Sequence, residues 1–534
     1  MWVFRSTKII IRNQEKFNCI SKKCFRKHHS MSIAKSSVKS RIRLNLSDPS
    51  LTRLHIAGVA GLWMTLGQLE KLYPESAKRP SNLTWSRTPH SISLDWDGEE
   101  DFIVLDWLLK QSFKISDEGL IDLPGVNSQT GNIQTKIIKH LGIRGTFLQH
   151  NKSFKSAGNV STVLIDEMEA IVLYKKVDEY AHQVFAKHLC NKQGQLLQEP
   201  IGIVGWLYPG AVIRHEVFRE ETKFHEKPEL ALALLFAPVA CQYFVLGSHL
   251  EREKPHFILV IPQVTDLEAY AQHCWNLTDL DFDYFHASSL GDAGLRFLTY
   301  ETNVQQTAFN PVERCLVILF GKAAWSKQQK TRTETAFLQA SETVNSVYKL
   351  SCIFFPNYQN FKSKNETPII ANILRGIIAD NLANSLPWWF NLSTKVQDNY
   401  LLELSNDDNQ GIYKMISNSQ WDIETQKLFI KCVHETLKIR YAKIYARTKE
   451  DEYVQIEREN IRIVSQLKRC TNAVNFRKFI AEFWGKTGHN PILQEHLDEI
   501  LSITSGIMDW KIAKDLTFIA LASYPKIKTT ESNI

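Results

Sequence analysis

The sequence predicts an α+β protein, with a mixed α/β N-terminal body built on at least one sheet, followed by an all-α C-terminal helical bundle. Two observations carry this prediction. Short strand-like runs alternate with helical patterns up to about residue 365, whereas beyond residue 411 the apolar spacing is almost wholly helical. A chain of 534 residues that is 44% hydrophobic and 23% charged has an ordinary globular composition and room for several domains.

The first element is a helix between Asp48-Pro49 and Pro74. Asp48 resembles an N-cap with proline in the first turn, and Pro74 ends the pattern. The stretch is too short to span a membrane and has no G-x-G-x-x-G loop for a dinucleotide. Its small residues would let a neighbouring backbone approach closely, so we interpret it as a buried packing helix. These residues are Ala57, Gly58, Ala60 and Gly61.

The rest of the body follows the same two periodicities. Alternating residues predict a half-buried strand over 90–96, and a helix follows over 99–113. Pro209-Gly210 predicts the turn of a hairpin over 201–218. The wholly apolar run 229–246 is assigned to a core helix. Buried strands are expected over 256–264 and 314–321.

The second half divides into a connector and a bundle. A helical pattern covers 367–382, and the polar stretch "LSNDDNQG" (404–411) is the best linker candidate. Four or five helices joined by short connections then suggest a bundle. The predicted division is a basic tail (1–42), the body (43–365), a helical connector and linker (366–411), and the bundle (412–534).

The net charge of +7 is concentrated in the tail. Residues 1–43 contain twelve basic residues and one acid, which leaves −4 for the remainder, so the body is not a uniformly basic nucleic-acid binder. The tail fits a disordered nucleic-acid arm, an organelle transit peptide, or upstream sequence read in error before a true start at Met31. We favour the third interpretation, and the second belongs to an alternative function, a mitochondrially targeted enzyme of unknown reaction.

Motifs for catalysis and metal binding are not found in the sequence. Nine scattered cysteines without a C-x-x-C favour a reduced cytoplasmic setting, and Cys19, Cys24, His28 and His29 match no common zinc spacing. "GKTG" (485–488) lacks the earlier glycine of a phosphate loop, and Gly485 is better explained as a helix C-cap. We therefore expect no catalytic residues, no metal and no cofactor, which favours a binding protein over an enzyme.

Two regions could contact nucleic acid. The interval 123–165 carries cations but no acid, and its polar loop offers amides that can hydrogen-bond base edges, although acids from other segments could balance these charges in space. Its candidates are Lys136, Lys139, Arg144, His150, Lys152 and Lys155, with Asn127, Gln129 and Asn132 as base readers. Arg214, after the predicted 209–210 turn, is a further phosphate or base contact, or else half of an ion pair.

The second region is in the helical part, where seven basic residues face two acids between 458 and 486. A solvated helix face is the plain alternative to a phosphate-binding surface. Interleaved aromatic residues there have helical spacing, so we assign them to the core and not to a base-stacking platform. The binding candidates are Arg462, Lys468, Arg469, Arg477 and Lys478, and the aromatic residues are Phe476, Phe479, Phe483 and Trp484.

Four segments, taken in order, resemble the large subunit of type I CRISPR surveillance (Cascade) complexes, and more narrowly the I-B-like and transposon-associated branch. They are "LSDPSLTRLHIAGVAGLWMTL", "TFLQHNK" (146–152), "GWLYPGAVIRH" (205–215) and "WKIAKDLTFIALASY" near the end, and the resemblance covers about residues 42–524. A family pattern that begins near residue 41 is why the tail appears foreign to the protein.

The resemblance implies a non-catalytic, cytoplasmic protein that assembles on RNA. Such subunits contact the 5′ end of the crRNA, recognise a short flanking motif (the PAM) on target double-stranded DNA, and stabilise the R-loop with a helical part similar to a Cascade small subunit. The implied partners are crRNA, target DNA, the backbone, 5′-handle and small subunits, and either a helicase-nuclease or transposition proteins. No membrane partner is expected.

Overall fold

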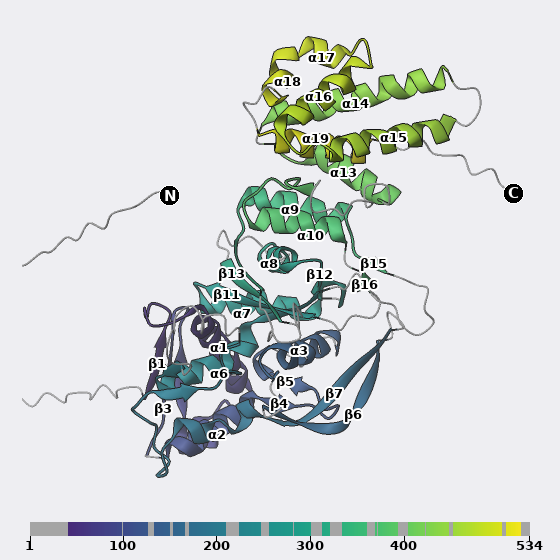
Figure 1. Cartoon of the computed structure of the whole chain (residues 1–534). Coiled ribbons are helices and arrows are strands. Elements are labelled where there is room, and N and C mark those ends of the chain that lie inside the picture. The colour runs from purple at the N-terminus through teal and green to yellow at the C-terminus, as the bar shows by residue number, and fades with distance from the viewer. Residues whose placement is uncertain are drawn as a thin grey trace, which may run out of the picture. The chain divides into compact units, whose positions relative to one another are not determined.

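A computed structural model confirms the α+β class, with sheets in the N-terminal half and helices dominating the C-terminal region (Figure 1). The structure describes residues 41–98, 100–126, 133–149, 153–165, 170–209, 224–246, 256–280, 282–300, 312–320, 334–359, 369–370, 372–392, 404–421, 423–447, 452–504 and 509–524. The predictions for the tail before Arg41 lie outside these residues.

Helix α1 (Arg53–Leu72) is the predicted packing helix, but it begins later than expected. Its N-cap is Thr52, whose side chain accepts a hydrogen bond from the His55 N–H, while His55 Nδ1 accepts one from the Thr52 N–H at 3.2 Å. Asp48 instead accepts the N–H of Ser50 at 2.9 Å in the preceding turn. The assignment of Asp48 as N-cap was wrong because a reciprocal capping pair four residues later competes with it.

Helix α6 (Pro228–Ala240) packs directly against α1, as the small residues of α1 predicted. A Cβ atom at Gly58 would overlap the carbonyl of Ala233, and one at Gly61 would overlap the carbonyl of Phe236. Every residue of α6 from Leu230 to Ala240 is buried. Two backbones therefore meet at a distance that only glycine permits, and this pair of helices forms the centre of the body's core.

We predict that Gly61→Ala lowers the free energy of unfolding by about 1–3 kcal/mol, because the added methyl group must push α6 away from α1. Gly485→Ala is the matched control, since a Cβ at this helical position meets nothing within 4 Å. The control should be neutral or slightly stabilising. Urea unfolding of both variants measures the difference, and equal stability would contradict the close approach.

The predicted core helix over 229–246 is correct only as far as Ala240. Cys241 is extended, and β10 (Gln242–Leu246) begins immediately after it. The error has a physical reason: a run that is apolar at every position shows no periodicity to separate a buried helix from a buried strand.

Strand β10 belongs to a five-stranded sheet with the order β12-β10-β11-β13-β14. The others are β11 (His256–Val264), β12 (His286–Ala287), β13 (Val312–Phe320) and β14 (Glu334–Gln339). All neighbours are antiparallel except β10 and β12. The two predicted buried strands, 256–264 and 314–321, are thus confirmed as β11 and β13. Helices α1, α3 (Ile133–Thr146) and α8 (Leu290–Leu298) pack against this sheet.

Smaller sheets complete the body. Strands β1 (Ile42–Asn45), β3 (Ser91–Asp95) and β2 (Thr84–Arg87) form an antiparallel sheet that includes the strand predicted over 90–96, and α2 (Asp101–Ser112) is the predicted following helix. Strand β6 (Phe154–Ile165) pairs with β7 (Ala170–Tyr180), and β4 (Lys114–Ile115) pairs with β5 (Ile121–Asp122). Strand β8 (Ile201–Ile203) begins the predicted 201–218 hairpin, but it pairs with β9 (Phe224–Glu226), which lies beyond that range. Gly210 of the predicted turn lies outside the described residues.

The stretch expected to be a linker is helical. Residues 406–411 form the first half of α13 (Asn406–Asn418), where the Ser405 side chain caps the Asp408 N–H at 3.0 Å and Asp408 accepts the Ser405 N–H at 3.3 Å. Asp407 and Asp408 also favour the positive end of a helix. The polar residues taken for a loop are therefore a capping box and the acidic first turn that follows it.

Helices α14 (Glu424–Tyr445), α15 (Glu452–Lys468), α16 (Ala473–Gly485) and α19 (Trp510–Ser523) form the main part of the predicted bundle, with short α17 (Pro491–Glu495) and α18 (Leu497–Thr504) between them. The prediction that Phe476, Phe479, Phe483 and Trp484 are core residues is confirmed, since all four are buried. Helix α16 ends at Gly485, but the cap is Lys486 and the glycine with a left-handed φ is Gly488, at +76°.

Candidate nucleic-acid interface

The cations predicted between residues 458 and 486 all lie on exposed positions of the helical region. We define the α15–α16 basic surface as Arg458, Arg462, Lys468, Arg469, Arg477, Lys478 and Lys486. Arg458, Arg462 and Arg469 recur at spacings of four and seven, which places them along one side of α15 and its C-terminal end. The four aromatic residues between them are buried, so these rings are not exposed beside the cations.

One carboxylate, that of Glu459, pairs with Arg462 of this surface. Glu459 accepts from Arg462 at 2.8 Å and also pairs with Arg440 of α14, so two guanidinium groups share one carboxylate. Arg440 is buried against the ring of Phe483, 5.0 Å from its centroid, whereas Arg462 is half-exposed. Long exposed cations in this arrangement suit a phosphate backbone, because they neutralise charge without reading bases.

The cations of α3 do not form a comparable surface. Lys139 is 7% exposed. Arg144 stacks over the ring of Phe154 at 4.9 Å and donates to the carbonyl of Lys175 at 3.4 Å, and burial lowers its pKa. Lys136, the third candidate on α3, is half-buried. The acid-free interval of the sequence therefore does not form a continuous exposed basic patch on this helix.

Lys155 forms an ion pair with an acid from another segment, as expected if acids from other segments balance the charges of the interval 123–165. Its ammonium pairs with Glu179 of β7 at 2.7 Å, and both side chains are exposed. An exposed pair of this kind contributes little to stability and leaves the ammonium accessible. The remaining candidates, namely His150, Lys152, Arg214, Asn127, Gln129 and Asn132, lie outside the residues that the structure describes.

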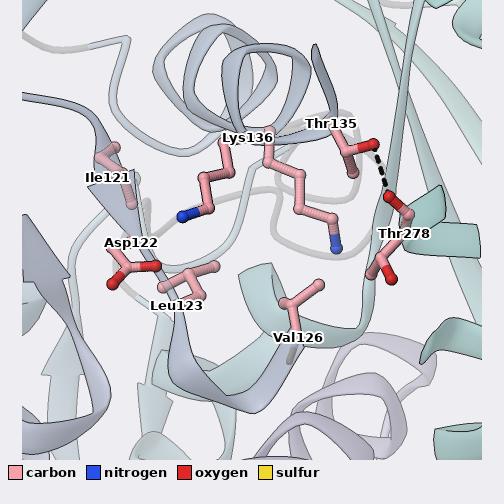
Figure 2. A pocket seen from close by; sticks show the side chains of 8 residues that line it. Ile121, Asp122, Leu123, Val126, Thr135, Lys136 and Thr278 are labelled. Carbon is pink, nitrogen blue, oxygen red and sulfur yellow. Dashed lines mark hydrogen bonds between the residues drawn. The ribbon is translucent and has the colours of Figure 1, made fainter. Parts of the chain in front are cut away.

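A small pocket that no sequence pattern predicted lies beneath α3 (Figure 2). Its volume is about 20 Å³. It is lined by Ile121, Asp122, Leu123, Val126, Thr135, Lys136, Lys139 and Thr278. The Thr135 hydroxyl donates to the carbonyl of Thr278 at 2.9 Å, across a separation of 143 residues. Residues so distant in the chain share no local pattern, and only the two lysines could have been selected from sequence.

Across the part of the chain that the structure describes, no three or more His, Cys, Asp or Glu side chains come together as a metal site would require. Among the same residues, none of the helices combines the length and apolarity that crossing a membrane demands.

Comparison with known proteins gives two family matches and one relative. Residues 43–235 match the DevT N-terminal domain, and residues 417–534 match the DevT C-terminal domain. The chain is 26% identical over 523 residues to "CRISPR-associated protein Cas8a1/Csx13" of Myxococcus xanthus (strain DK1622), an alignment that covers 92% of this chain and 90% of that protein.

These matches agree in extent with the four resemblance segments, because the first three lie within the N-terminal match and the last lies within the C-terminal match. The alignment to the Myxococcus protein also covers residues between the two domain matches. The chain is thus similar to a CRISPR-associated Cas8 protein along nearly its whole length, and its two ends match the two DevT domain models, which supports the resemblance to Cascade large subunits.

Proposed function

We propose that this protein is the non-catalytic large subunit of a crRNA-guided Cascade complex. The observation that carries the proposal is the end-to-end alignment with a CRISPR-associated Cas8 protein, which covers body and bundle together. A non-catalytic role also fits the sequence, which has neither a phosphate loop nor a zinc-protease motif. In such a complex, base pairing with the guide supplies sequence specificity, and protein contacts the backbone and a short flanking motif.

Within this function, the α15–α16 basic surface is assigned to the backbone of a DNA strand in the R-loop. Its side chains are long, exposed and separated from the buried aromatic residues, which fits phosphate contact without base readout. The body (43–365) is assigned to the crRNA 5′ end and the PAM, with the bundle (412–534) as the part that resembles a small subunit.

The finer assignments rest on sequence alone. Asn127, Gln129 and Asn132 are proposed PAM readers because amide side chains can pair with base edges, and Lys152 and Arg214 are proposed phosphate contacts. The I-B-like and transposon-associated branch is proposed from the resemblance of the four segments. It leaves two uses of the complex, recruitment of a helicase-nuclease for antiviral defence or of transposition proteins.

Co-purification tests the proposed function. The tagged full chain, expressed with the products of its neighbouring genes, should elute with several of them and with RNA that sequencing identifies as repeat-derived guides. A preparation that is consistently free of RNA and of other subunits would contradict the proposal. The identity of the co-purifying proteins also separates defence from transposition.

We predict that the double charge reversal Arg469→Glu with Lys478→Glu weakens DNA binding by the assembled complex at least about tenfold at low salt. The plot of log affinity against log salt should also become shallower by about 1.4 to 1.8, because two phosphate contacts are lost. Lys187→Glu with Lys192→Glu, on two exposed lysines of the body, is the matched control and should change neither quantity appreciably. If both double variants behave alike, the α15–α16 basic surface is only a solvated helix face.

A further inference from the structure

The pocket beneath α3 contains the ammonium of a buried lysine. Lys139 is only 7% exposed and lines the pocket. Among the residues that the structure describes, its ammonium has neither a hydrogen-bond acceptor nor an ion-pair partner. The thiols of Cys241 and Cys274 interact with it electrostatically and are also buried, and burial raises the pKa of both thiols so that they stay neutral.

This arrangement is unfavourable unless something else occupies the pocket. Burial lowers the pKa of Lys139 to about 8, so the side chain is still mostly charged at neutral pH. An isolated ammonium in an apolar setting costs several kcal/mol unless an anion or hydrogen-bond acceptor reaches it. A water molecule or an anion could relieve that cost, and an anion would do so more completely because it also balances the charge.

The other polar groups of the pocket indicate how such an occupant would be held. Lys136 adds a second ammonium, and Asp122 is the one carboxylate among the lining residues, so the lining is net positive. The hydroxyls do not compete for the anion: Thr135 donates to the carbonyl of Thr278, and Thr278 donates to the carbonyl of Trp275 at 2.6 Å. The two lysines are thus the donors that remain for a ligand.

The volume limits what can enter. About 20 Å³ accommodates one or two oxygen-sized groups, which excludes a base or a sugar but admits the terminal oxygens of a phosphoryl group presented at the mouth. We propose that this pocket binds a single phosphoryl group through Lys136 and Lys139. The group can come from a nucleic-acid backbone or from free phosphate, and the proposal does not depend on assembly into a Cascade complex.

Thermal unfolding of the purified full chain tests the pocket with inorganic phosphate as the ligand. In a non-phosphate buffer at pH 7.5, phosphate should raise the unfolding midpoint more than chloride of equal ionic strength does, and this excess should grow with concentration as expected for a ligand of the folded state. Lys139→Met keeps the apolar stem and removes the buried charge, so it should fold at least as stably as the parent protein. Lys139→Met and Lys136→Gln should each raise the apparent Kd for phosphate at least about tenfold.

Lys110→Gln provides the control, because Lys110 is exposed and pairs with Asp106 on the surface; it should keep the full phosphate effect. Competition then identifies the source of the group. A short single-stranded oligonucleotide that displaces phosphate from the parent protein, but shows no such competition in Lys139→Met, indicates a backbone phosphate, and failure to compete indicates the free anion. A phosphate effect that is no larger than that of chloride, or that survives in both pocket variants, would overturn the proposal.

Discussion

Asp292→Asn should lower the free energy of unfolding by about 3–5 kcal/mol, one of the two largest effects that we expect in this protein. Asp292 is fully buried at the N-terminal turn of α8, and its carboxylate is the counter-charge for the buried guanidinium of Arg375 and the largely buried one of Arg296. Removing that charge leaves both guanidinium groups without compensation in the core. Breaking a buried ion pair from one side is far more damaging than replacing the whole pair with apolar residues.

The geometry around Asp292 explains why an amide cannot substitute. One carboxylate oxygen accepts the Arg375 Nε–H at 3.2 Å and the Ser288 N–H at 2.7 Å, and the other accepts the Tyr348 hydroxyl at 2.5 Å. Burial alone would raise the pKa of Asp292, but Arg296 and Arg375 hold it below its usual value. An asparagine would have to turn an N–H₂ group toward one of these donors.

This network has a structural role because it joins three helices. Asp292 lies on α8, Tyr348 on α9 (Glu342–Phe354) and Arg375 on α10 (Ile373–Ala383). Arg375 also donates to the Ser288 hydroxyl at 2.9 Å and to the carbonyl of Phe355 at 3.4 Å, so its N–H groups are satisfied from several sides while Asp292 balances its charge. Loss of the central carboxylate should therefore loosen the packing of all three helices together.

Urea unfolding of the full chain measures the effect, with Asp117→Asn on an exposed aspartate as the control, which should be within about 0.5 kcal/mol of the parent protein. Tyr348→Phe should cost less, about 1–2 kcal/mol, because it removes one hydrogen bond and no charge. A loss in Asp292→Asn no greater than in the exposed control would show that the buried pairs are not formed as described.

Sequence reasoning succeeded where a local pattern and a tertiary contact depend on the same residues. Gly58 and Gly61 predicted a close helix contact, and the contact is the one they make with α6. It failed where the local pattern was ambiguous, as at the boundary between α6 and β10. It also failed where one pattern of residues fits two structures. Ser405 and Asp408 have the spacing of a capping box, but their polarity is also typical of a linker, and the linker prediction was wrong.

The candidate site shows the same contrast between residues that a local pattern can predict and residues that only the fold brings together. Exposure of the α15–α16 basic surface could be anticipated, because helical spacing assigned the aromatic residues inward and left the cations outward. The surroundings of Lys139 could not, because they come from β5, from α3 and from the segment after α7 (Leu267–Asn276), which meet only in the fold. A count of charges along the chain cannot distinguish an exposed lysine from one that is 7% exposed.

The second large effect is acid unfolding driven by buried histidines. His55, His140 and His182 are at most 1% exposed, and burial lowers their pKa values from 6.5 to about 4, 4 and 3. In the unfolded chain each ring takes up a proton near pH 6.5, whereas in the folded chain it stays neutral to much lower pH. The stability that depends on neutral rings is therefore complete above pH 6.5 and is lost as the pH falls toward 4.

The magnitude is large compared with the stability of a typical domain. At pH 5 each ring favours the unfolded state by about 2 kcal/mol, so the three together remove about 6 kcal/mol, against a usual total of about 5–15 kcal/mol. Burial also lowers the pKa values of His273 and His434 to about 4, which adds to the effect in the same direction. We expect the urea midpoint to fall steeply between pH 6.5 and 5, with uptake of about three to five protons on unfolding.

His182 allows this explanation to be separated from general acid sensitivity. Its ring lies among Phe113, Tyr180 and Trp206, with centroid distances of 5.0, 5.6 and 4.8 Å. Within the described part of the chain, neither of its ring nitrogens has a hydrogen-bond partner. Phenylalanine fills the same space and takes up no proton, so His182→Phe should raise stability more at pH 5 than at pH 8 and reduce the proton uptake by about one. His225→Gln, on an exposed ring, should shift neither quantity by a comparable amount. An equal gain at both pH values would mean that the variant improves packing alone, and that the acid lability has its origin in other groups.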